Sequence, residues 1–289
     1  MSIVLRSEPR STSGESLDPA DWRDLRTQGH RMLDDMFDYL ENIRDRPVWQ
    51  PIPDDVRRRF DAPVPTAPTD LAEVHESFMR DILPFAGGNV HPRFMGWVQG
   101  GGNPVGMLAE MLAAGLNANL GGRDHMPIEV ERQIVRWIRA LFGFPEGASG
   151  LFVTGTSMAN FIGVLVARTA ALGTGIRRSG LASDARKLTA YTSRAAHCCI
   201  AQAMDLAGLG SEALRVVATN DRHQIDLAAL EHAIAQDRRE GFVPFLVVGT
   251  AGTVDAASAK RLQPYGRFSC ANRMQVSKSW RSVSSRAAL

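Results

Sequence analysis

The chain has 289 residues, of which 44% are hydrophobic and 22% charged, a composition typical of a globular protein and not of a disordered or fibrous one. It contains no apolar run of about 18 residues, the length that a membrane-spanning helix needs, and we expect no secretory signal. The three cysteines, two of them adjacent, do not form a disulfide framework, so we expect a reducing, cytoplasmic location.

Charge is distributed unevenly along the chain. The last acidic residue is Asp255, and residues 256–289 contain seven basic residues, seven serines and no acidic residue. The first 255 residues therefore carry a net charge of −5, although the whole chain carries +2. This mildly acidic body lacks the basic surface that nucleic-acid binding requires. We interpret residues 256–289 as an aberrant basic tail.

Residues 1–85 are predicted to form an N-terminal helical arm. Between residues 21 and 46 apolar side chains recur every three or four positions, which predicts an amphipathic helix. A proline-rich connector with a short helix at 54–60 follows, and then a helix at 70–82. The apolar stripe of the first helix needs a partner, which is either the rest of the chain or a second subunit.

Residues 86–255 are predicted to form most of an α/β domain. Two helices are expected at 105–116 and 129–142, and from residue 150 short apolar runs alternate with helical segments. Such alternation predicts a mostly parallel sheet with helices on both faces. The expected strands are 151–154, 187–192, 214–218 and 243–250, and the expected helices between them are 157–170, 197–207 and 226–239.

Three short motifs follow predicted strands. The first is a Gly-Thr-Ser turn that opens a helix at residues 155–157, where backbone N–H groups and the helix dipole favour an anion. Taken alone, it is better interpreted as a plain strand-to-helix turn capped by Thr156 or Ser157. His197 and Thr250 also follow strand ends, where open α/β sheets bind ligands. Together the three motifs predict one crevice at the carboxyl edge of the sheet.

The order of these motifs closely resembles the group II pyridoxal-phosphate (PLP) dependent amino-acid decarboxylases, which include the aromatic amino-acid and glutamate decarboxylases. The resemblance extends from about residue 17 to residue 255. It implies the type I PLP-dependent transferase fold, incomplete in this chain, and an intertwined homodimer in which the N-terminal helices pack on the partner subunit. The matching segments are 38–40, 91–94, Glu131 with Trp137, 155–160, 191–193, 196–197 and 249–253.

The resemblance also implies a cofactor and roles for individual residues. PLP is the expected cofactor, with its phosphate held by Thr156, Ser157 and Met158, largely through their backbone N–H groups. His197, the expected catalytic residue, would stack on the pyridine ring, and Thr250 would lie against the ring.

Three further residues are expected on the substrate side of the cofactor. These are Trp97, Val98 and Gln99, which follow the His-Pro-Arg-Phe segment. Trp97 has an equally good interpretation as a core aromatic residue beside a glycine-rich loop.

The resemblance ends just after Asp255, before two groups that PLP decarboxylation needs. A lysine binds the cofactor covalently, and a carboxylate keeps the pyridine nitrogen protonated. Asp255 lies in a Val-Asp-Ala-Ala sequence like the family's aspartate motif, but no helix and strand separate it from the Gly-Thr pair at 252–253. Lys278 faintly resembles the lysine motif but has no histidine before it. We therefore expect a chain without the cofactor lysine, inactive, and changed after residue 255 by a shifted reading frame.

This departure predicts an unpaired sheet edge, exposed apolar surface and poor solubility. The leading functional hypothesis is that the family decarboxylates an L-amino acid to the amine and CO₂ with PLP. This chain is expected to be inactive. Two alternatives stay open. One is another type I PLP lyase or aldehyde-forming activity, and the other is a non-catalytic fragment that pairs with an intact homologue and modulates it.

Overall fold

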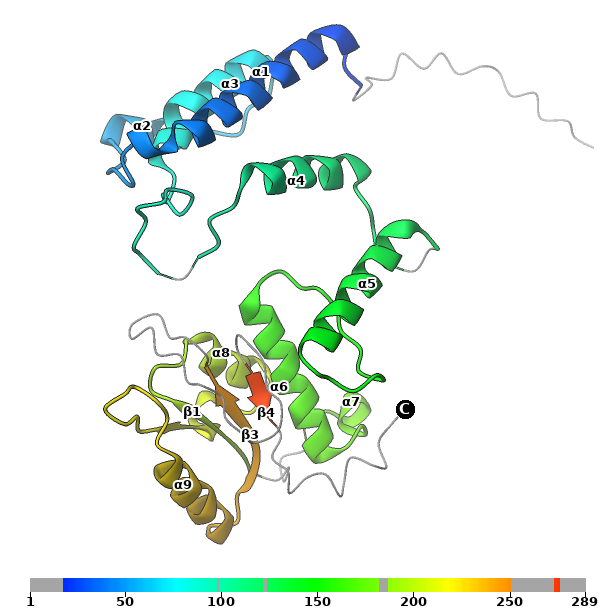
Figure 1. Cartoon of the computed structure of the whole chain (residues 1–289), viewed down its shortest axis with the longest axis vertical. Helices are drawn as coiled ribbons and strands as arrows, with labels where there is room; N and C mark the ends of the chain where they lie inside the picture. The colour runs from blue at the N-terminus through cyan, green and yellow to red at the C-terminus, as the bar shows by residue number, and fades with distance from the viewer. Residues whose placement is uncertain (1–17, 98, 122–123, 182–186, 251–272, 276–289) are drawn as a thin grey trace, which may run out of the picture. The chain divides into compact units, whose positions relative to one another are not determined.

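The computed structural model describes residues 18–97, 99–121, 124–181, 187–250 and 273–275 (Figure 1). The chain divides into two compact units, Met1–Asn117 and Ala118–Leu289, and each is described by itself. The domain boundaries at residues 85 and 255 stay predictions. No helix in the described part of the chain is both long and apolar enough to cross a membrane.

The described part of the first unit is helical, as expected. Three of its helices begin at a side chain that accepts a backbone N–H from the first turn, namely Asp21, Asp70 and Asn103. The predicted helices at 21–46, 54–60, 70–82 and 105–116 are confirmed with small changes at their ends. The elements are α1 (Trp22–Glu41), η1 (Ile43–Asp45), α2 (Asp54–Arg59), α3 (Leu71–Ser77), the π turn η2 (Phe78–Ile82), η3 (Leu83–Phe85) and α4 (Pro104–Leu116).

Helix α1 lies beside α3 (Figure 1). The contact is organised by the buried side chain of His75, whose Nδ1 lies 3.1 Å from Gln28 Nε2 and whose Nε2 lies 3.4 Å from Asp35 Oδ2. Tyr39 is the buried residue of α1, whereas Leu25 stays exposed. The contacts within this unit therefore cover only part of the apolar stripe of α1.

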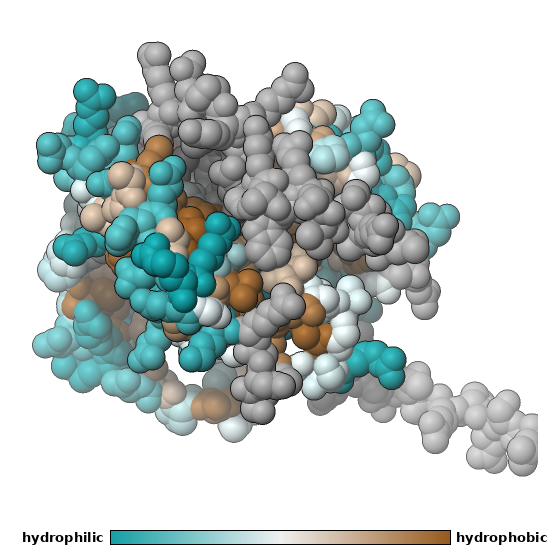
Figure 2. Space-filling view, turned by 90° about the horizontal axis from the view of Figure 1, so that it is seen from below, coloured by the Kyte–Doolittle hydropathy of each residue, from teal (hydrophilic) through white to brown (hydrophobic). Residues whose placement is uncertain are grey.

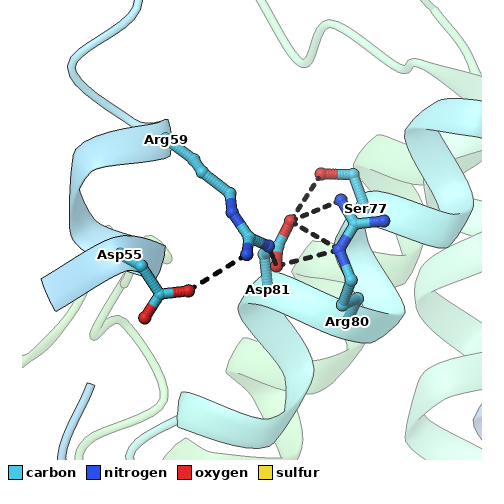
Figure 3. Close-up of polar contacts among 5 residues, drawn as sticks. All are labelled: Asp55, Arg59, Ser77, Arg80 and Asp81. Carbon is cyan, nitrogen blue, oxygen red and sulfur yellow. Dashed lines mark hydrogen bonds and ion pairs between the residues drawn. The ribbon is translucent and has the colours of Figure 1, made fainter. Parts of the chain in front are cut away.

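A buried carboxylate joins α2 to the turn after α3 (Figure 3). Asp81 accepts hydrogen bonds from Arg80 Nη2 at 2.7 Å, Arg59 Nη1 at 2.5 Å and the Ser77 hydroxyl at 3.3 Å. The hydrogen bond from Arg80 lowers the pKa of Asp81 below its usual value, against the effect of burial. Arg59 also pairs with Asp55 one helical turn earlier, at 3.1 Å, which orients its guanidinium toward Asp81.

The second unit has an α/β fold with a mostly parallel sheet. Strand β1 pairs in parallel with both β2 and β3, and the strand order is β2-β1-β3-β4. The expected fold class is therefore confirmed. The elements are α5 (Met126–Leu141), α6 (Thr156–Leu172), α7 (Ile176–Ser179), β1 (Leu188–Ser193), α8 (Cys199–Leu206), η4 (Ser211–Ala213), β2 (Leu214–Val217), α9 (Leu227–Arg239), β3 (Val243–Gly249) and β4 (Arg273–Gln275).

Helices cover both faces of this sheet (Figure 1). Side chains along β1 point alternately to the two faces, as in any strand. Leu188 and Ala190 pack with α6 and α8 in the main apolar core, whereas the Tyr191 hydroxyl reaches Asp237 on α9. Burial on both faces is what the short apolar runs predicted.

Two expectations about strands are wrong. Residues 151–154 are not a strand: they pair with no strand of the described chain, and the N–H of Phe152 donates to the Glu131 side chain. The edge of β3 is also not wholly unpaired. Residues Val247, Val248 and Gly249 pair with the antiparallel strand β4.

Large apolar side chains are exposed in the second unit, as expected. In the space-filling view, apolar residues (brown) reach the surface between polar ones (teal) (Figure 2). Leu141 at the end of α5 is 74% exposed, and Val216 on the edge strand β2 is 62% exposed. Such residues mark surfaces that become buried in an assembly, or that promote aggregation.

Candidate functional site

The turn before α6 has the geometry of an anion-binding helix start. Gly155 adopts φ +90° and ψ 166°, a conformation that is essentially restricted to glycine. No side chain of the described residues caps this helix, so the predicted alternative of a turn capped by Thr156 or Ser157 is wrong. Ala159 N–H donates to Gly155 O at 3.3 Å and begins the regular helical pattern. The backbone N–H groups of Thr156, Ser157 and Met158 precede that point, on exposed residues where the helix dipole is positive.

His197 lies between β1 and α8. Its side chain is exposed, and its Nδ1 accepts the backbone N–H of Cys199 at 3.1 Å. A nitrogen that accepts a hydrogen bond carries no proton, so the neutral ring carries its proton on Nε2. This contact fixes the imidazole at the start of α8 with one nitrogen directed away from the backbone.

Two buried hydrogen bonds hold the predicted site segments together. Asn160 Nδ2, on the fifth residue of α6, donates to Cys199 Sγ at 3.3 Å, which joins the beginning of α6 to the start of α8. Thr192 Oγ1 donates to Val248 O at 3.2 Å, which joins the carboxyl ends of β1 and β3.

The half-buried Thr250 follows β3 directly. It therefore lies at the same edge of the sheet as His197, which follows β1. That these two residues and the turn at 155–158 line one crevice stays a prediction.

The residues expected on the substrate side belong to the first unit. Trp97 is 76% exposed, with a positive φ of 45° and its ring 6.5 Å from that of Phe94. The interpretation of Trp97 as a core residue is therefore wrong. Gln99 is exposed, and Val98 lies outside the described residues. Their position on the substrate side stays a prediction.

A buried polar network lies on the other face of β1. The Tyr191 hydroxyl donates to Asp237 Oδ2 at 2.5 Å and lies 3.0 Å from Thr189 Oγ1. Arg215 Nη2 on β2 donates to Asp237 Oδ1 at 3.1 Å. The network therefore attaches both strands to α9, and it fixes the strand that leads to His197.

The environment of this network shifts two pKa values in opposite directions. Burial raises the pKa of Tyr191, and the hydrogen bond to Asp237 raises it further. Burial alone would raise the pKa of Asp237, but hydrogen bonds from Arg215 and Tyr191 outweigh it and hold the pKa of this carboxyl below its usual value. The sequence did not indicate the network, because an aspartate near the end of an amphipathic helix is typical of a solvent-exposed position.

Comparison with known proteins assigns the family. The model of the pyridoxal-dependent decarboxylase conserved domain matches residues 53–271. The chain belongs to the pyridoxal-dependent decarboxylase family. Within it the chain resembles the group II enzymes that act on aromatic amino acids, tyrosine or tryptophan.

Similar proteins support the family assignment and its extent. An aromatic-L-amino-acid decarboxylase of Bacillus atrophaeus is 29% identical over 244 residues, which cover 83% of this chain and 48% of that protein. A phenylacetaldehyde synthase of Arabidopsis thaliana is 27% identical over 270 residues, which cover 90% of this chain and 54% of that protein. The crystal structure of mouse CSAD in its apo form shares the fold, with a TM-score of 0.74, 22% identity and coverage of 84% of this chain and 52% of that one. The chain spans about half the length of the relatives it matches.

The lysines of the chain bear on the chemistry of this family. Lys187 is the one lysine among the described residues, and its Nζ lies 5.4 Å from the centre of the Phe242 ring. It precedes β1, so it lies at the amino end of the strand that has His197 beyond its carboxyl end. Lys260, Lys278 and Asp255 lie outside the described residues. Lys187 is therefore at the wrong end of the sheet to reach a cofactor beside His197.

Proposed function

We propose that the activity of the family to which this polypeptide belongs is PLP-dependent decarboxylation of an amino acid to the amine and CO₂, and that the turn at 155–158 of this polypeptide binds the cofactor phosphate. The observation that supports this most strongly is the exposed start of α6, which no described side chain caps and which follows a glycine at φ +90°. A dianionic phosphate matches this site because it accepts several N–H groups at once and interacts favourably with the helix dipole.

The residues at this edge fit the rest of the cofactor. Thr156, Ser157 and Met158 present backbone N–H groups to the phosphate, His197 stacks on the pyridine ring, and Thr250 lies against it. When bound, PLP accepts the electrons left behind as the carboxylate departs as CO₂. The protein residues bind and orient the cofactor, and the Nε2 proton of His197, which lies in the plane of the imidazole, is available to an acceptor beside the stacked rings.

We propose further that the 289-residue polypeptide binds PLP without a covalent bond and does not decarboxylate amino acids by itself. Lys187 supports this, because it stands at the far end of β1 from His197. Lys278 also supports it, because the histidine that precedes the family's lysine is absent from its sequence. The binding free energy then comes from phosphate contacts and stacking alone.

The proposed substrate is an L-amino acid, with Trp97, Val98 and Gln99 on the substrate side. An aldehyde-forming activity is a second candidate, favoured by the similarity to a phenylacetaldehyde synthase. The two activities differ in their product from the same amino acid, which is either the amine or the aldehyde. Chromatography of the products therefore separates them.

A homodimer is the proposed assembly, in which the N-terminal helices pack on the partner. The partly covered stripe of α1 and the exposed Val105 and Leu116 of α4 support this. The same surfaces favour the non-catalytic alternative, in which the chain pairs with an intact homologue. Co-purification of a tagged chain with such a homologue, lost when Leu116 is changed to Asp, supports that alternative.

Binding and catalysis are tested together with the purified polypeptide. PLP is added, the mixture is divided, and one half is reduced with borohydride before both are dialysed. We expect saturable PLP binding that dialysis removes from both halves, and no labelled CO₂ from carboxyl-labelled aromatic amino acids. Cofactor retained on one mapped lysine after reduction contradicts non-covalent binding. Absence of saturable binding contradicts the cofactor assignment.

A further inference from the structure

The loop between α5 and α6 runs back along one face of α5 before it reaches the glycine turn (Figure 1). Three residues of α5, spaced four positions apart, contact successive parts of this loop. They are Arg139, Val135 and Glu131, and residues at this spacing lie on the same face of a helix. We name this set of contacts the α5 anchor row.

The contacts of the row follow the loop in order. Near the end of α5, the Arg139 guanidinium donates to the carbonyl of Glu146. Further along, Gly150 lies directly on Val135: a Cβ added to this glycine would be 3.2 Å from Val135 Cγ1. Last, the backbone N–H of Phe152 donates to Glu131 Oε1 at 2.9 Å.

The spacing of the last two contacts agrees with simple geometry. Four residues of helix rise about 6 Å, and two residues of extended chain span about 7 Å. One turn of α5, from Val135 back to Glu131, therefore matches the two loop residues from Gly150 to Phe152. The loop thus follows α5 in register and has little slack before the glycine turn.

We propose that Glu131 is the positioning residue of the phosphate-binding turn. It holds the last anchored residue, Phe152, three positions before Gly155. From there Gly155 N–H donates to Val153 O at 2.8 Å, so the position of the turn depends on the residue next to Phe152. Glu131 does not contact the cofactor, and it acts by fixing the N–H groups that do. This inference rests on the proposed function of the turn.

The same helix provides a matched control. Glu129 is also a glutamate on α5, but its side chain, 45% exposed, pairs with Arg132 at 2.5 Å. The comparison therefore uses Glu131→Ala, Glu131→Gln and Glu129→Ala in the full chain. Glutamine keeps a neutral oxygen that accepts the Phe152 N–H, whereas alanine removes the acceptor.

Two measurements separate the positioning role from the proposed function. Hydrogen exchange by mass spectrometry follows the amides of residues 150–158 without any ligand. Titration with PLP gives a dissociation constant. For Glu131→Ala we expect faster exchange in this segment and PLP binding weakened by about 3- to 10-fold, as the loss of one hydrogen bond predicts. Glu131→Gln and Glu129→Ala should match the unaltered chain in both.

The outcomes are decisive in each case. Unchanged exchange in Glu131→Ala overturns the inference, and so does weakened PLP binding of equal size in Glu131→Gln. Faster exchange with an unchanged PLP dissociation constant also overturns it, because the anchor then has no effect on binding. If the unaltered chain binds no PLP, the proposed function fails, while the exchange data still decide whether Glu131 holds the turn.

Discussion

The glycine at the start of α6 offers a sharp test, because the same helix ends on a glycine of nearly the same conformation. Gly155 has φ +90° and ψ 166°, and Gly173 has φ +88° and ψ 160°. Neither has an atom within 4 Å of the position that a Cβ would take. Replacing either residue by alanine therefore introduces the same backbone strain and no steric overlap.

The expected magnitudes follow from that comparison. Placing alanine in this backbone region costs about 1–3 kcal/mol, so both variants should be destabilised by a similar amount. Only Gly155 precedes the proposed phosphate site. A turn that relaxes at this point loses one charge-assisted hydrogen bond, about 1.5–3 kcal/mol, which corresponds to a PLP dissociation constant about 10- to 150-fold higher.

Chemical denaturation and PLP titration of both variants provide the assay. We expect similar losses of unfolding free energy for Gly155→Ala and Gly173→Ala, with weakened PLP binding in the first alone. Equal weakening in both variants would show that general destabilisation accounts for the effect. Unchanged binding in Gly155→Ala would refute the assignment of the phosphate site.

Three further outcomes are expected. His197→Ala should weaken PLP binding, whereas His197→Phe, which keeps an aromatic ring, should retain most of it; equal loss in both would argue against stacking. The pKa of Asp237 is lower in the folded protein, so its stabilising effect is present above a pH of about 4 and is lost as the pH falls through the folded pKa. The free energy of unfolding of Asp237→Asn, measured with urea, should therefore fall less steeply with acid than that of the unaltered chain. The pKa of Tyr191 is raised in the folded protein, so its contribution to stability is complete below about pH 10 and is lost at higher pH. In Tyr191→Phe the free energy of unfolding should therefore change less with pH on the alkaline side. An unchanged pH profile in either variant would contradict the role given to the network.

Much of the fold follows from short-range patterns that the sequence displays directly. The stripe of α1 and the apolar runs at β1, β2 and β3 repeat with the periods of a helix and of buried strands. The strand at 151–154 was wrongly predicted because a strand needs a neighbour for its backbone groups, and local sequence does not show whether one is present. Its backbone instead finds an acceptor in Glu131, 21 positions earlier.

The site was predicted in part for a similar reason. His197 and Thr250 follow β1 and β3, and parallel strands bring their carboxyl ends to one edge, whereas the glycine turn follows a segment that is not a strand. The contacts that fix them, such as Asn160 with Cys199, join residues 39 positions apart. Pairings of this kind depend on how α6 and α8 pack, which no local pattern determines.

The most direct test of the central claim is to observe the backbone amides of the glycine turn while inorganic phosphate or PLP is added. In a labelled sample, NMR spectra should show saturable shifts at Thr156, Ser157 and Met158 with either ligand, and shifts near His197 with PLP alone. Helix α5 serves as an internal control, because its start at Met126 also has no side-chain cap. Shifts at the start of α6 with either ligand, joined by shifts near His197 with PLP, and none at the start of α5 would support the account. Equal shifts at both helix starts, or none at 156–158, would contradict it.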